Sequence, residues 1–294
     1  MTVHTVGLCG LGQMGLAVAE RLASAYRVVA ADPDAQRRAL AEQVDGVTAV
    51  ADAESLRDAP VVVLSLPRPE VSHALCAELA GLLPRGAVVI ETSTVLPADA
   101  RACEAVLRPH GIGYVDAAIL SGVGQMRDGA ATLLVGPAAT GGGIDTVLDT
   151  LGSTVLRFGT TGAGMAAKVI NNQVAHAVMV VLAEATALAT SAGVGLDHLV
   201  ALLSKPDGGL VRPLTHRIAE RVAHSDYDGG MPTDAARKDS VLALSMAQQL
   251  GVPLFATQAA HTVYDLAVAA GLGRRDYAAV ATLWQQWTGE RIGG

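Results

Sequence analysis

The sequence predicts an α/β protein whose N-terminal domain is a doubly wound parallel sheet and whose C-terminal domain is all-helical. Short apolar strands alternate with helical patterns over the first 160 residues, at the spacing of strand–helix–strand units. Residues 60–66 include a continuous apolar run, as expected for a parallel strand covered on both faces. We find no strand pattern in residues 163–192. A chain of 294 residues can form two domains, which we place at 1–160 and 161–294.

The expected elements follow from hydrophobic periodicity in chain order. The expected strands cover residues 3–8, 27–31, 60–66, 87–91, 113–118, 132–135 and 154–158. The expected helices cover residues 16–25, 36–42, 71–82 and 97–108. Glycine and proline then divide the C-terminal half into helices, of which the first and longest is expected from 163 to 192. Three adjacent glycines at 141–143 indicate a surface turn.

Composition narrows the class of protein. Acidic residues outnumber basic ones by 28 to 21, which argues against a nucleic-acid-binding face. The chain is 51% hydrophobic, but its most apolar stretch carries His176 and Glu184, so we expect no membrane span. Three cysteines without a Cys-x-x-Cys spacing and the lack of a basic leader lead us to expect a cytoplasmic protein. No histidine or acidic cluster has metal-ligand spacing, so we expect no metal site.

A glycine-rich turn follows the first expected strand. It reads Gly10-Leu11-Gly12-Gln13-Met14-Gly15. Gly10 permits a tight turn, Gly12 lets a pyrophosphate approach the backbone, and Gly15 lets the next helix pack against the sheet. The N–H groups at the start of that helix then face the phosphates. A simple strand–turn–helix corner is the alternative, but the complete context favours a dinucleotide-binding Rossmann domain.

The residue that ends the second expected strand bears on the choice of dinucleotide. Asp32 can accept hydrogen bonds from the ribose hydroxyls of NAD and would repel the 2′-phosphate of NADP. Arg37 and Arg38 follow closely and could offset that repulsion, or they could be solvated helix charges. We therefore expect NAD as the cofactor, with NADP possible.

Two later segments end strands at the same edge of the sheet, where ligands bind in this fold. They are Leu66-Pro67 and Thr92-Ser93-Thr94. We expect both segments to contact the cofactor. The hydroxyls of Ser93 and Thr94 could donate hydrogen bonds to it, or they could cap the helix that begins near Pro97.

Lys168 lies in an otherwise apolar stretch of the long helix, with Asn172 four residues later on the same face. Partial desolvation would lower the pKa of this lysine and suit it for general acid–base chemistry. The alternative is a structural lysine whose amine reaches solvent. Asn172 could hydrogen-bond a substrate hydroxyl or the lysine itself. His176, one turn later, is expected in the core or at an interface.

These motifs resemble the β-hydroxyacid dehydrogenase family, which includes 3-hydroxyisobutyrate dehydrogenases and tartronate semialdehyde reductases. The resemblance covers nearly the whole chain. It rests on the glycine-rich segment 6–15, the segment 91–97, the GxGxxxKxxNN stretch at 162–172, Arg237-Lys238-Asp239, and the closing stretch 271–278 with Asp276. It implies a Rossmann domain followed by a helical domain like that of 6-phosphogluconate dehydrogenase, and a homodimer or homotetramer.

The resemblance also implies an activity. It implies reversible hydride transfer between a nicotinamide cofactor and a β-hydroxyacid, with Lys168 as the acid–base catalyst and Asn172 orienting the reacting oxygen. It places Lys238 beside both cofactor and substrate. The implied substrate contacts are Ser121, Gly122, Val123, Asn171 and Lys238.

The substrate loop departs from the family pattern DAPVSGG. Residues 116–122 read DAAILSG, so that without gaps Leu120 takes the position of the serine. A shift of one residue restores Ser121 and Gly122 as the pair that would hold the substrate carboxylate. Loss of the hydroxyl would weaken the grip on a small carboxylate and admit a more apolar substrate, unless backbone N–H groups of 121–124 hold it.

Two other functions remain open at this point. An imine reductase has the same architecture, although its members usually carry aspartate or tyrosine in place of Lys168. A non-catalytic dinucleotide-binding protein would retain Gly10, Gly12, Gly15 and Asp32 but would not need Lys168 and Asn172 together.

Overall fold

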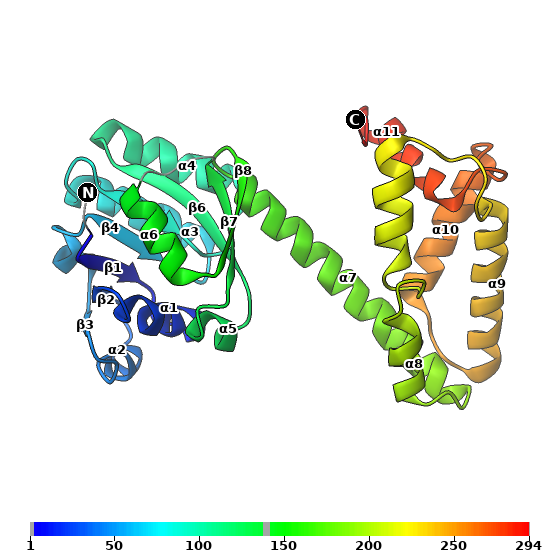
Figure 1. Ribbon diagram of the computed structural model, residues 1–294, viewed down its shortest axis with the longest axis horizontal. Coiled ribbons are helices and arrows are strands. Elements are labelled where there is room, and N and C mark those ends of the chain that lie inside the picture. Colours follow the sequence, from blue (N-terminus) through cyan, green and yellow to red (C-terminus); the bar gives the residue numbers. More distant parts are fainter. Residues whose placement is uncertain (1–2, 138–141, 294) are drawn as a thin grey trace. The chain divides into compact units, whose positions relative to one another are not determined.

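The computed structural model describes residues 3–137 and 142–293 and forms two compact units, Met1–Gln173 and Val174–Gly294 (Figure 1). The division falls inside the long helix α7 (Ala163–Ser191), beyond the turn near residue 160 where the sequence places the boundary. The first turns of α7 belong to the N-terminal unit because Met165 is fully buried in its core.

The N-terminal unit contains an eight-stranded sheet in the order β3-β2-β1-β4-β5-β6-β7-β8. The strands are β1 (Thr5–Cys9), β2 (Arg27–Ala31), β3 (Val47–Val50), β4 (Val61–Leu64), β5 (Val88–Glu91), β6 (Gly113–Leu120), β7 (Thr132–Pro137) and β8 (Thr154–Gly159). The predicted doubly wound sheet is confirmed, with β3 added at its edge. The chain reverses the strand order between β1 and β4, which creates the crevice where such sheets bind ligands.

The prediction that the whole sheet is parallel is wrong at β7. This strand runs antiparallel to β6, with Ala117 opposite Val135, and β8 then runs parallel to β7. The link between β6 and β7 contains only the short helix α5 (Val123–Arg127), which is too short for the crossover that a parallel pair needs. The sheet is therefore mixed.

Helices cover both faces of this sheet, and the two core clusters correspond to the two faces. One cluster contains side chains of α1 (Gln13–Ala23), α2 (Ala35–Ala41), α5 and α6 (Gly142–Leu151). The other contains side chains of α3 (Pro69–Leu82), α4 (Pro97–Leu107) and the start of α7. Val61 and Val63 of β4 join the first cluster, whereas Val62 and Leu64 join the second. The continuous apolar run thus reflects burial on both faces, as predicted.

The surface turn expected at the three glycines is wrong for the part that the structure describes. Helix α6 begins at Gly142 and includes Gly143, whereas Gly141 lies outside the described residues. The buried residues Ile144, Val147 and Leu148 supply the apolar face of this helix. Tertiary packing therefore overrides the low helix propensity of glycine at its N-terminus.

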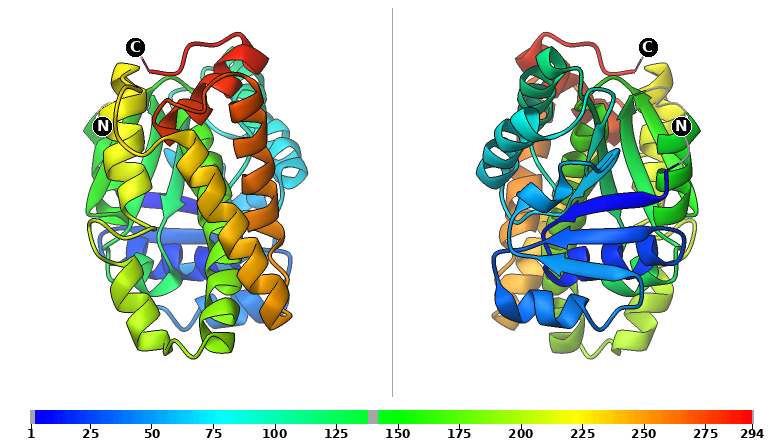
Figure 2. Two further views of the ribbon diagram at one scale, coloured as in Figure 1. Left: turned by 90° about the vertical axis from the view of Figure 1, so that its right-hand side faces the viewer. Right: turned by 90° about the vertical axis from the view of Figure 1, so that its left-hand side faces the viewer.

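The C-terminal unit is helical, as predicted, and the left view of Figure 2 shows its helices in colours from green through yellow to red. Its elements after α7 are α8 (Leu196–Leu203), a π-helical segment (Pro213–Arg221), α9 (Thr233–Leu250), α10 (Phe255–Ala269), a 3-10 segment (Tyr277–Val280) and α11 (Ala281–Thr288). Asp276 is fully buried, where Oδ2 accepts a hydrogen bond from the N–H of Met231 and Oδ1 lies 3.2 Å from Nε of Arg217. The closing motif of the sequence thus has a structural role within this unit.

By length and composition alone, α7 satisfies the requirements for a membrane span, as do the core helices of many proteins. Its apolar sequence is interrupted by Lys168 and Glu184. The Glu184 carboxylate accepts hydrogen bonds from the N–H groups of Ala256 and Thr257, at 2.7 and 3.1 Å. This carboxylate therefore caps the start of α10 and fixes it against α7 within the C-terminal unit.

Candidate functional site

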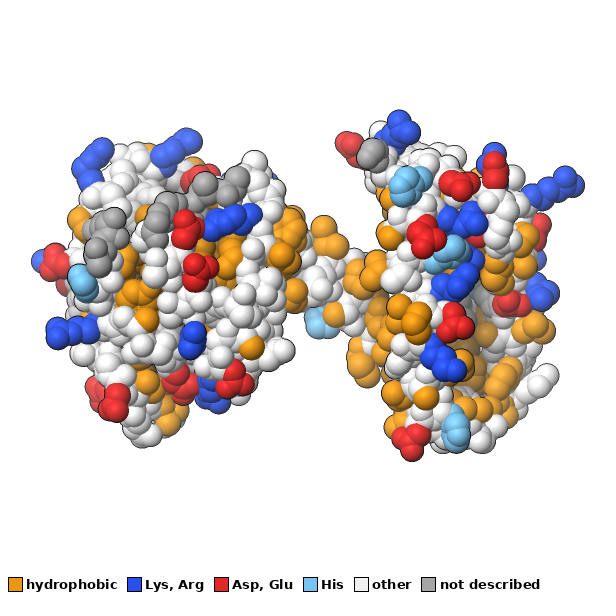
Figure 3. Space-filling model, viewed as in Figure 1, with side chains coloured by type: hydrophobic (Ala, Val, Ile, Leu, Met, Phe, Trp, Pro, Cys, Tyr) orange, Lys and Arg blue, Asp and Glu red, His pale blue; other side chains and the backbone are white. Residues whose placement is uncertain are grey.

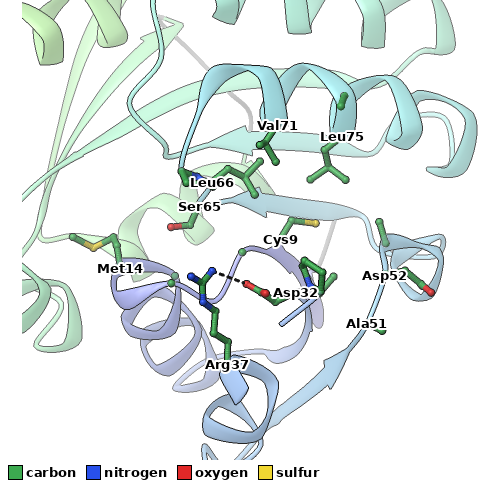
Figure 4. A pocket seen from close by; sticks show the side chains of 18 of the residues that line it. Cys9, Met14, Asp32, Arg37, Ala51, Asp52, Ser65, Leu66, Val71 and Leu75 are labelled. Atoms are coloured by element: carbon green, nitrogen blue, oxygen red, sulfur yellow. Dashed lines mark ion pairs between the residues drawn. The ribbon is translucent and has the colours of Figure 1, made fainter. Parts of the chain in front are cut away.

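A cavity of about 650 Å³ opens at the carboxyl ends of β1, β2 and β4 (Figure 4). It lies at the point of the sheet where the strand order reverses. Most of the predicted cofactor-binding residues line it, namely Gly10, Gly12, Gln13, Met14, Gly15, Asp32, Leu66 and Pro67. Leu11 does not, because its side chain is buried in the core beneath the turn.

Glycine is required at the three positions of the turn for different physical reasons. Gly10 has a φ of +97°, and a Cβ there would overlap the carbonyl oxygen of Ser65. A Cβ on Gly15 would overlap the carbonyl oxygen of Gly10. A Cβ on Gly12, in contrast, would meet no atom within 4 Å, because this residue faces the open cavity at the N-cap of α1. The open space at Gly12, beside the free N–H groups of a helix start, fits the pyrophosphate of a dinucleotide.

Asp32 is nearly fully buried at the inner wall of this cavity. Its Oδ2 accepts a hydrogen bond from the N–H of Leu11 at 2.7 Å, and its Oδ1 accepts one from the N–H of Asp34 at 2.9 Å. In Figure 4 the Arg37 guanidinium faces this carboxylate, with Nη1 3.7 Å from Oδ2. Arg38 instead donates to the carbonyl oxygens of Asp32 and Pro33. Only Arg37 of the two arginines therefore lines the cavity.

The segments that follow β4 and β5 are joined by a hydrogen bond. The N–H of Leu66 donates to Oγ of Ser93 at 2.7 Å, which ties Ser93 to the cavity wall without making it a lining residue. Thr94 is exposed and also does not line the cavity. Neither residue caps the following helix, because the N-cap of α4 is Leu96. The structure thus places Ser93 behind Leu66 rather than on the cavity surface.

The buried carboxylate of Glu91 is hydrogen-bonded to the backbone of Ser93. The N–H of Ser93 donates to Oε1 of Glu91 at 3.0 Å, and Oε2 has no hydrogen-bond partner among the described residues. Burial raises the pKa of Glu91 to about 7, although hydrogen bonds from Ser93 oppose that shift. The sequence signal for this residue is an acid that ends an apolar strand, directly before Thr92.

The raised pKa of Glu91 predicts a pH-dependent stability. The native state binds this proton more tightly than the unfolded chain, so its stabilising contribution is present below about pH 4.5 and is lost as pH rises through about 7. We expect the free energy of unfolding of the wild type to fall, relative to Glu91→Gln, by about 3 kcal/mol between pH 4.5 and 8. Urea denaturation of both proteins across this range measures the difference. Parallel pH profiles would show that Glu91 does not titrate in this range.

Several titratable side chains lie near Glu91. The titratable groups that interact with it are His73 from α3, whose charge lowers the pKa of Glu91, and Cys9, Cys76 and Tyr114. Burial and nearby acids raise the pKa of Cys9 and Tyr114. His73 lies 3.1 Å from Asp99, so His73→Gln in the Glu91→Gln background is the matched control.

Lys168 and Asn172 lie on one face of α7, in the part of this helix that belongs to the N-terminal unit. Both side chains are half-buried, whereas Asn171 and His176 are exposed. Partial burial lowers the pKa of the Lys168 amine. Among the described residues, no ion pair to Lys168 is found, so the amine is desolvated without a compensating carboxylate. These are the properties expected of a general acid–base group.

The loop after β6 contains the other predicted substrate contacts. Oγ of Ser121 is buried and has no hydrogen-bond partner in the part of the chain that the structure describes. The N–H of Gly122 donates to Oε1 of Gln125 at 3.1 Å, so this backbone group is already used within the loop. Val123 begins α5 and is packed against the core. An unpaired buried hydroxyl at Ser121 is therefore the polar group of this loop that a ligand would satisfy.

Lys238 belongs to the C-terminal unit, where it lies on α9. Its amine is exposed and lies 3.1 Å from Oδ1 of Asp239, whereas the preceding residue, Arg237, pairs with Asp265 of α10. Among the described residues of this unit, the ion pair found for the Lys238 amine is the one with the adjacent Asp239. Its predicted place beside cofactor and substrate stays a prediction.

Two family models together match nearly the whole chain. One, described as the NAD-binding domain of 6-phosphogluconate dehydrogenase, matches residues 5–162. The other, described as NAD-binding of NADP-dependent 3-hydroxyisobutyrate dehydrogenase, matches residues 162–284. The two matches meet at the start of α7.

Whole-length relatives are found among known proteins. The chain is 29% identical to 2-(hydroxymethyl)glutarate dehydrogenase of Eubacterium barkeri, covering 98% of this chain and 97% of that protein. It is 25% identical to a solved 3-hydroxyisobutyrate dehydrogenase of Mycobacterium tuberculosis with L-serine, with a TM-score of 0.65 and coverage of 97% and 100%. An imine reductase from Pseudomonas sp. is 22% identical, with a TM-score of 0.84 and coverage of 96% and 99%, and shows the same fold.

Proposed function

This chain belongs to the β-hydroxyacid dehydrogenase family and is an NAD(P)-dependent oxidoreductase, and from that premise we propose that it interconverts a β-hydroxyacid and the matching semialdehyde or keto acid. The observation that carries the proposal is the half-buried amine of Lys168, which has no ion pair among the residues that the structure describes and lies in the same unit as the dinucleotide cavity. A protein that only binds a dinucleotide has no need of a desolvated lysine, which is costly to bury.

The bound cofactor supplies the hydride acceptor or donor at C4 of its nicotinamide ring. Lys168 Nζ takes the hydroxyl proton as the alcohol is oxidised and returns a proton to the carbonyl oxygen in the reverse direction. Asn172, one turn further along α7, orients that oxygen toward the amine. Ser121 Oγ holds the substrate carboxylate. The chain thus contributes orientation and proton transfer.

Both the names of the relatives and the residues of this chain support the proposed substrate class. The relatives are named for 2-(hydroxymethyl)glutarate and 3-hydroxyisobutyrate, and both compounds carry a hydroxyl on the carbon β to a carboxylate. The Ser121 hydroxyl, which lacks a hydrogen-bond partner among the described residues, is suited to a carboxylate. In the alignment without gaps, Leu120 takes the family's serine position instead, which would favour a substrate that is more apolar than the common ones.

Absorbance of NAD(P)H, followed with a panel of β-hydroxyacids and cyclic imines, tests the proposed reaction. We expect turnover of β-hydroxyacids, with a preference for those that carry an apolar substituent. Turnover of imines alone would favour an imine reductase, whose fold this chain shares. Cofactor binding without turnover of either class would favour a non-catalytic protein.

We propose NAD as the preferred cofactor. Asp32 lies at the cavity wall and would repel a 2′-phosphate, while Arg37 beside it is the group that would attract one. In Asp32→Ala we expect the ratio of kcat/KM for NAD over NADP to fall by about 10- to 100-fold, the value of a hydrogen bond to a charged group. Arg37→Ala is the matched variant, in which that ratio should rise. An unchanged ratio in Asp32→Ala would contradict the assignment.

We also propose that the chain forms a homodimer or a homotetramer. Helices α7 and α8 expose large apolar side chains, including Met179, Val180, Leu196 and Val200, and Figure 3 shows such side chains along α7. A second copy of the chain is the partner that would cover them. Light scattering should give a molar mass that is a multiple of the chain mass, reduced by Met179→Glu. A monomeric wild type would contradict this proposal.

A further inference from the structure

A second buried carboxylate, Asp116, lies in β6, opposite Glu91 of β5 in the register of the sheet. It is fully buried, and both of its oxygens are hydrogen-bonded. Oδ1 accepts from the N–H of Gly162 at 3.0 Å, and Oδ2 accepts from the N–H of Met165 at 3.2 Å. These N–H groups belong to the turn before α7 and to its first turn. One side chain of the sheet therefore joins two backbone groups at the start of the helix that carries Lys168.

Three glycines allow the backbone to approach closely around this contact. A Cβ on Gly136 of β7 would overlap Oδ1 of Asp116. A Cβ on Gly164 would overlap the carbonyl oxygen of Leu134. Gly162 has a φ of +88°, and a Cβ there would lie 2.8 Å from the carbonyl oxygen of Pro97. The start of α7 is thus in direct contact with β7 and α4, which explains both glycines of the GxGxxxKxxNN stretch.

The partial positive charge at the N-terminus of α7 favours a carboxylate at the position of Asp116. The first four N–H groups of a helix have no partner within the helix, and its N-terminus carries partial positive charge. Burial raises the pKa of Asp116, but the hydrogen bonds from Gly162 and Met165 favour its charged form. A carboxylate at this point also leaves no buried N–H group of Gly162 or Met165 unsatisfied.

We propose that Asp116 is a positioning residue for catalysis, which fixes the first turn of α7 and thereby the place of Lys168, three residues beyond Met165. The proposal rests on the proposed role of Lys168 as the acid–base group. Asp116 does not line the dinucleotide cavity, so its effect should appear in the chemical step and not in cofactor binding. A misplacement of a reacting group by about 1 Å can lower the rate by about 100-fold.

The test uses two replacements of Asp116 and one change on the other side of the same contact. Asp116→Ala removes both acceptors, whereas Asp116→Asn retains one oxygen acceptor for the two N–H groups. Gly164→Ala leaves Asp116 intact but forces the first turn of α7 away from β7. Thr161→Val is the matched control, because it removes a hydrogen bond to Glu104 at the same turn without touching Asp116.

We expect kcat to fall by about 100-fold in Asp116→Ala and by less in Asp116→Asn. The kcat of Gly164→Ala should also fall, whereas that of Thr161→Val should stay close to the wild-type value. The dissociation constant for NADH should stay within about twofold of wild type in the Asp116 variants. The pKa of the Lys168 amine should rise toward that of an exposed lysine, as the amine becomes more solvated. This pKa is a readout that a role in folding alone would not change.

The Lys168 pKa can be followed directly, because lysine occurs in this chain only at positions 168, 205 and 238. Reductive methylation with ¹³C-formaldehyde gives one dimethylamine signal for each lysine and one for the N-terminal amine, and Lys168→Arg identifies the one that belongs to Lys168. Wild-type kcat and an unchanged Lys168 pKa in Asp116→Asn and Gly164→Ala would overturn the proposal. If Lys168→Ala retained full activity, the proposed reaction mechanism would fail instead, while the pKa shift would still report on Asp116.

Discussion

Replacing Lys168 by alanine is expected to lower kcat by roughly 10²–10⁴-fold, the usual contribution of a positioned general acid–base group. The amine is half-buried, and this partial burial lowers its pKa, which favours the unprotonated form that can accept the hydroxyl proton. The dissociation constant for NADH should change little, because Lys168 does not line the dinucleotide cavity. Steady-state kinetics with the best β-hydroxyacid of the panel, and fluorescence titration with NADH, measure the two quantities.

Lys168→Arg separates the catalytic role from a structural one. A guanidinium keeps the positive charge and the long apolar stem, but it does not lose its proton in proteins. If Lys168 only extends its amine to solvent, arginine should substitute for it with near wild-type kcat. We expect instead that Lys168→Arg is as inactive as Lys168→Ala, whereas Lys205→Ala, at an exposed lysine, retains activity.

Replacing Gly12 by valine is expected to abolish detectable dinucleotide binding while leaving the fold intact. The position at which its side chain would lie is empty of protein atoms, and it faces the cavity at the start of α1. A valine there would occupy the space that the pyrophosphate needs and would cover the N–H groups of the helix start. Fluorescence titration with NADH measures the binding, and the thermal midpoint measures the fold.

Gly15→Ala is the informative comparison for Gly12→Val. Its added methyl group would overlap the carbonyl oxygen of Gly10, so the turn itself would have to move. We expect a clear fall in the thermal midpoint of Gly15→Ala and none in Gly12→Val. Normal affinity for NADH in Gly12→Val would show that the cavity at β1 and β4 is not the cofactor site.

The elements that the sequence predicts well are those whose signal is local. The apolar run of β4 and the glycine-rich turn are short segments with one physical explanation each, and both appear where expected. Strand β3 is not indicated by its sequence because it is an edge strand of four residues and is only partly buried. The reversed direction of β7 is not encoded in its own residues, and only the short link before it could reveal it.

Prediction of the site from the sequence is also limited to features whose signal is local. The sequence singles out Gly12, Asp32 and Lys168 because each stands in a motif whose chemistry is local. It does not reveal that Ser93 supports Leu66, or that Asp116 anchors α7, because those hydrogen bonds join residues that are far apart in the chain. In the sequence, Glu91 and Asp116 are acids within apolar strands. Only the folded structure shows which backbone N–H groups donate hydrogen bonds to them.

The central claim is that Lys168 is the acid–base catalyst, and its most direct test is the pH titration of the Lys168 dimethylamine signal by ¹³C NMR. The titration is compared with the pH dependence of kcat/KM for oxidation of a β-hydroxyacid by the same methylated protein. We expect the pKa of Lys168 to lie below that of an ordinary lysine side chain, and to coincide in the free enzyme with the pH at which kcat/KM is half-maximal. The central claim would be contradicted if Lys168 titrated in the ordinary range of a lysine side chain while the rate changed at a different pH.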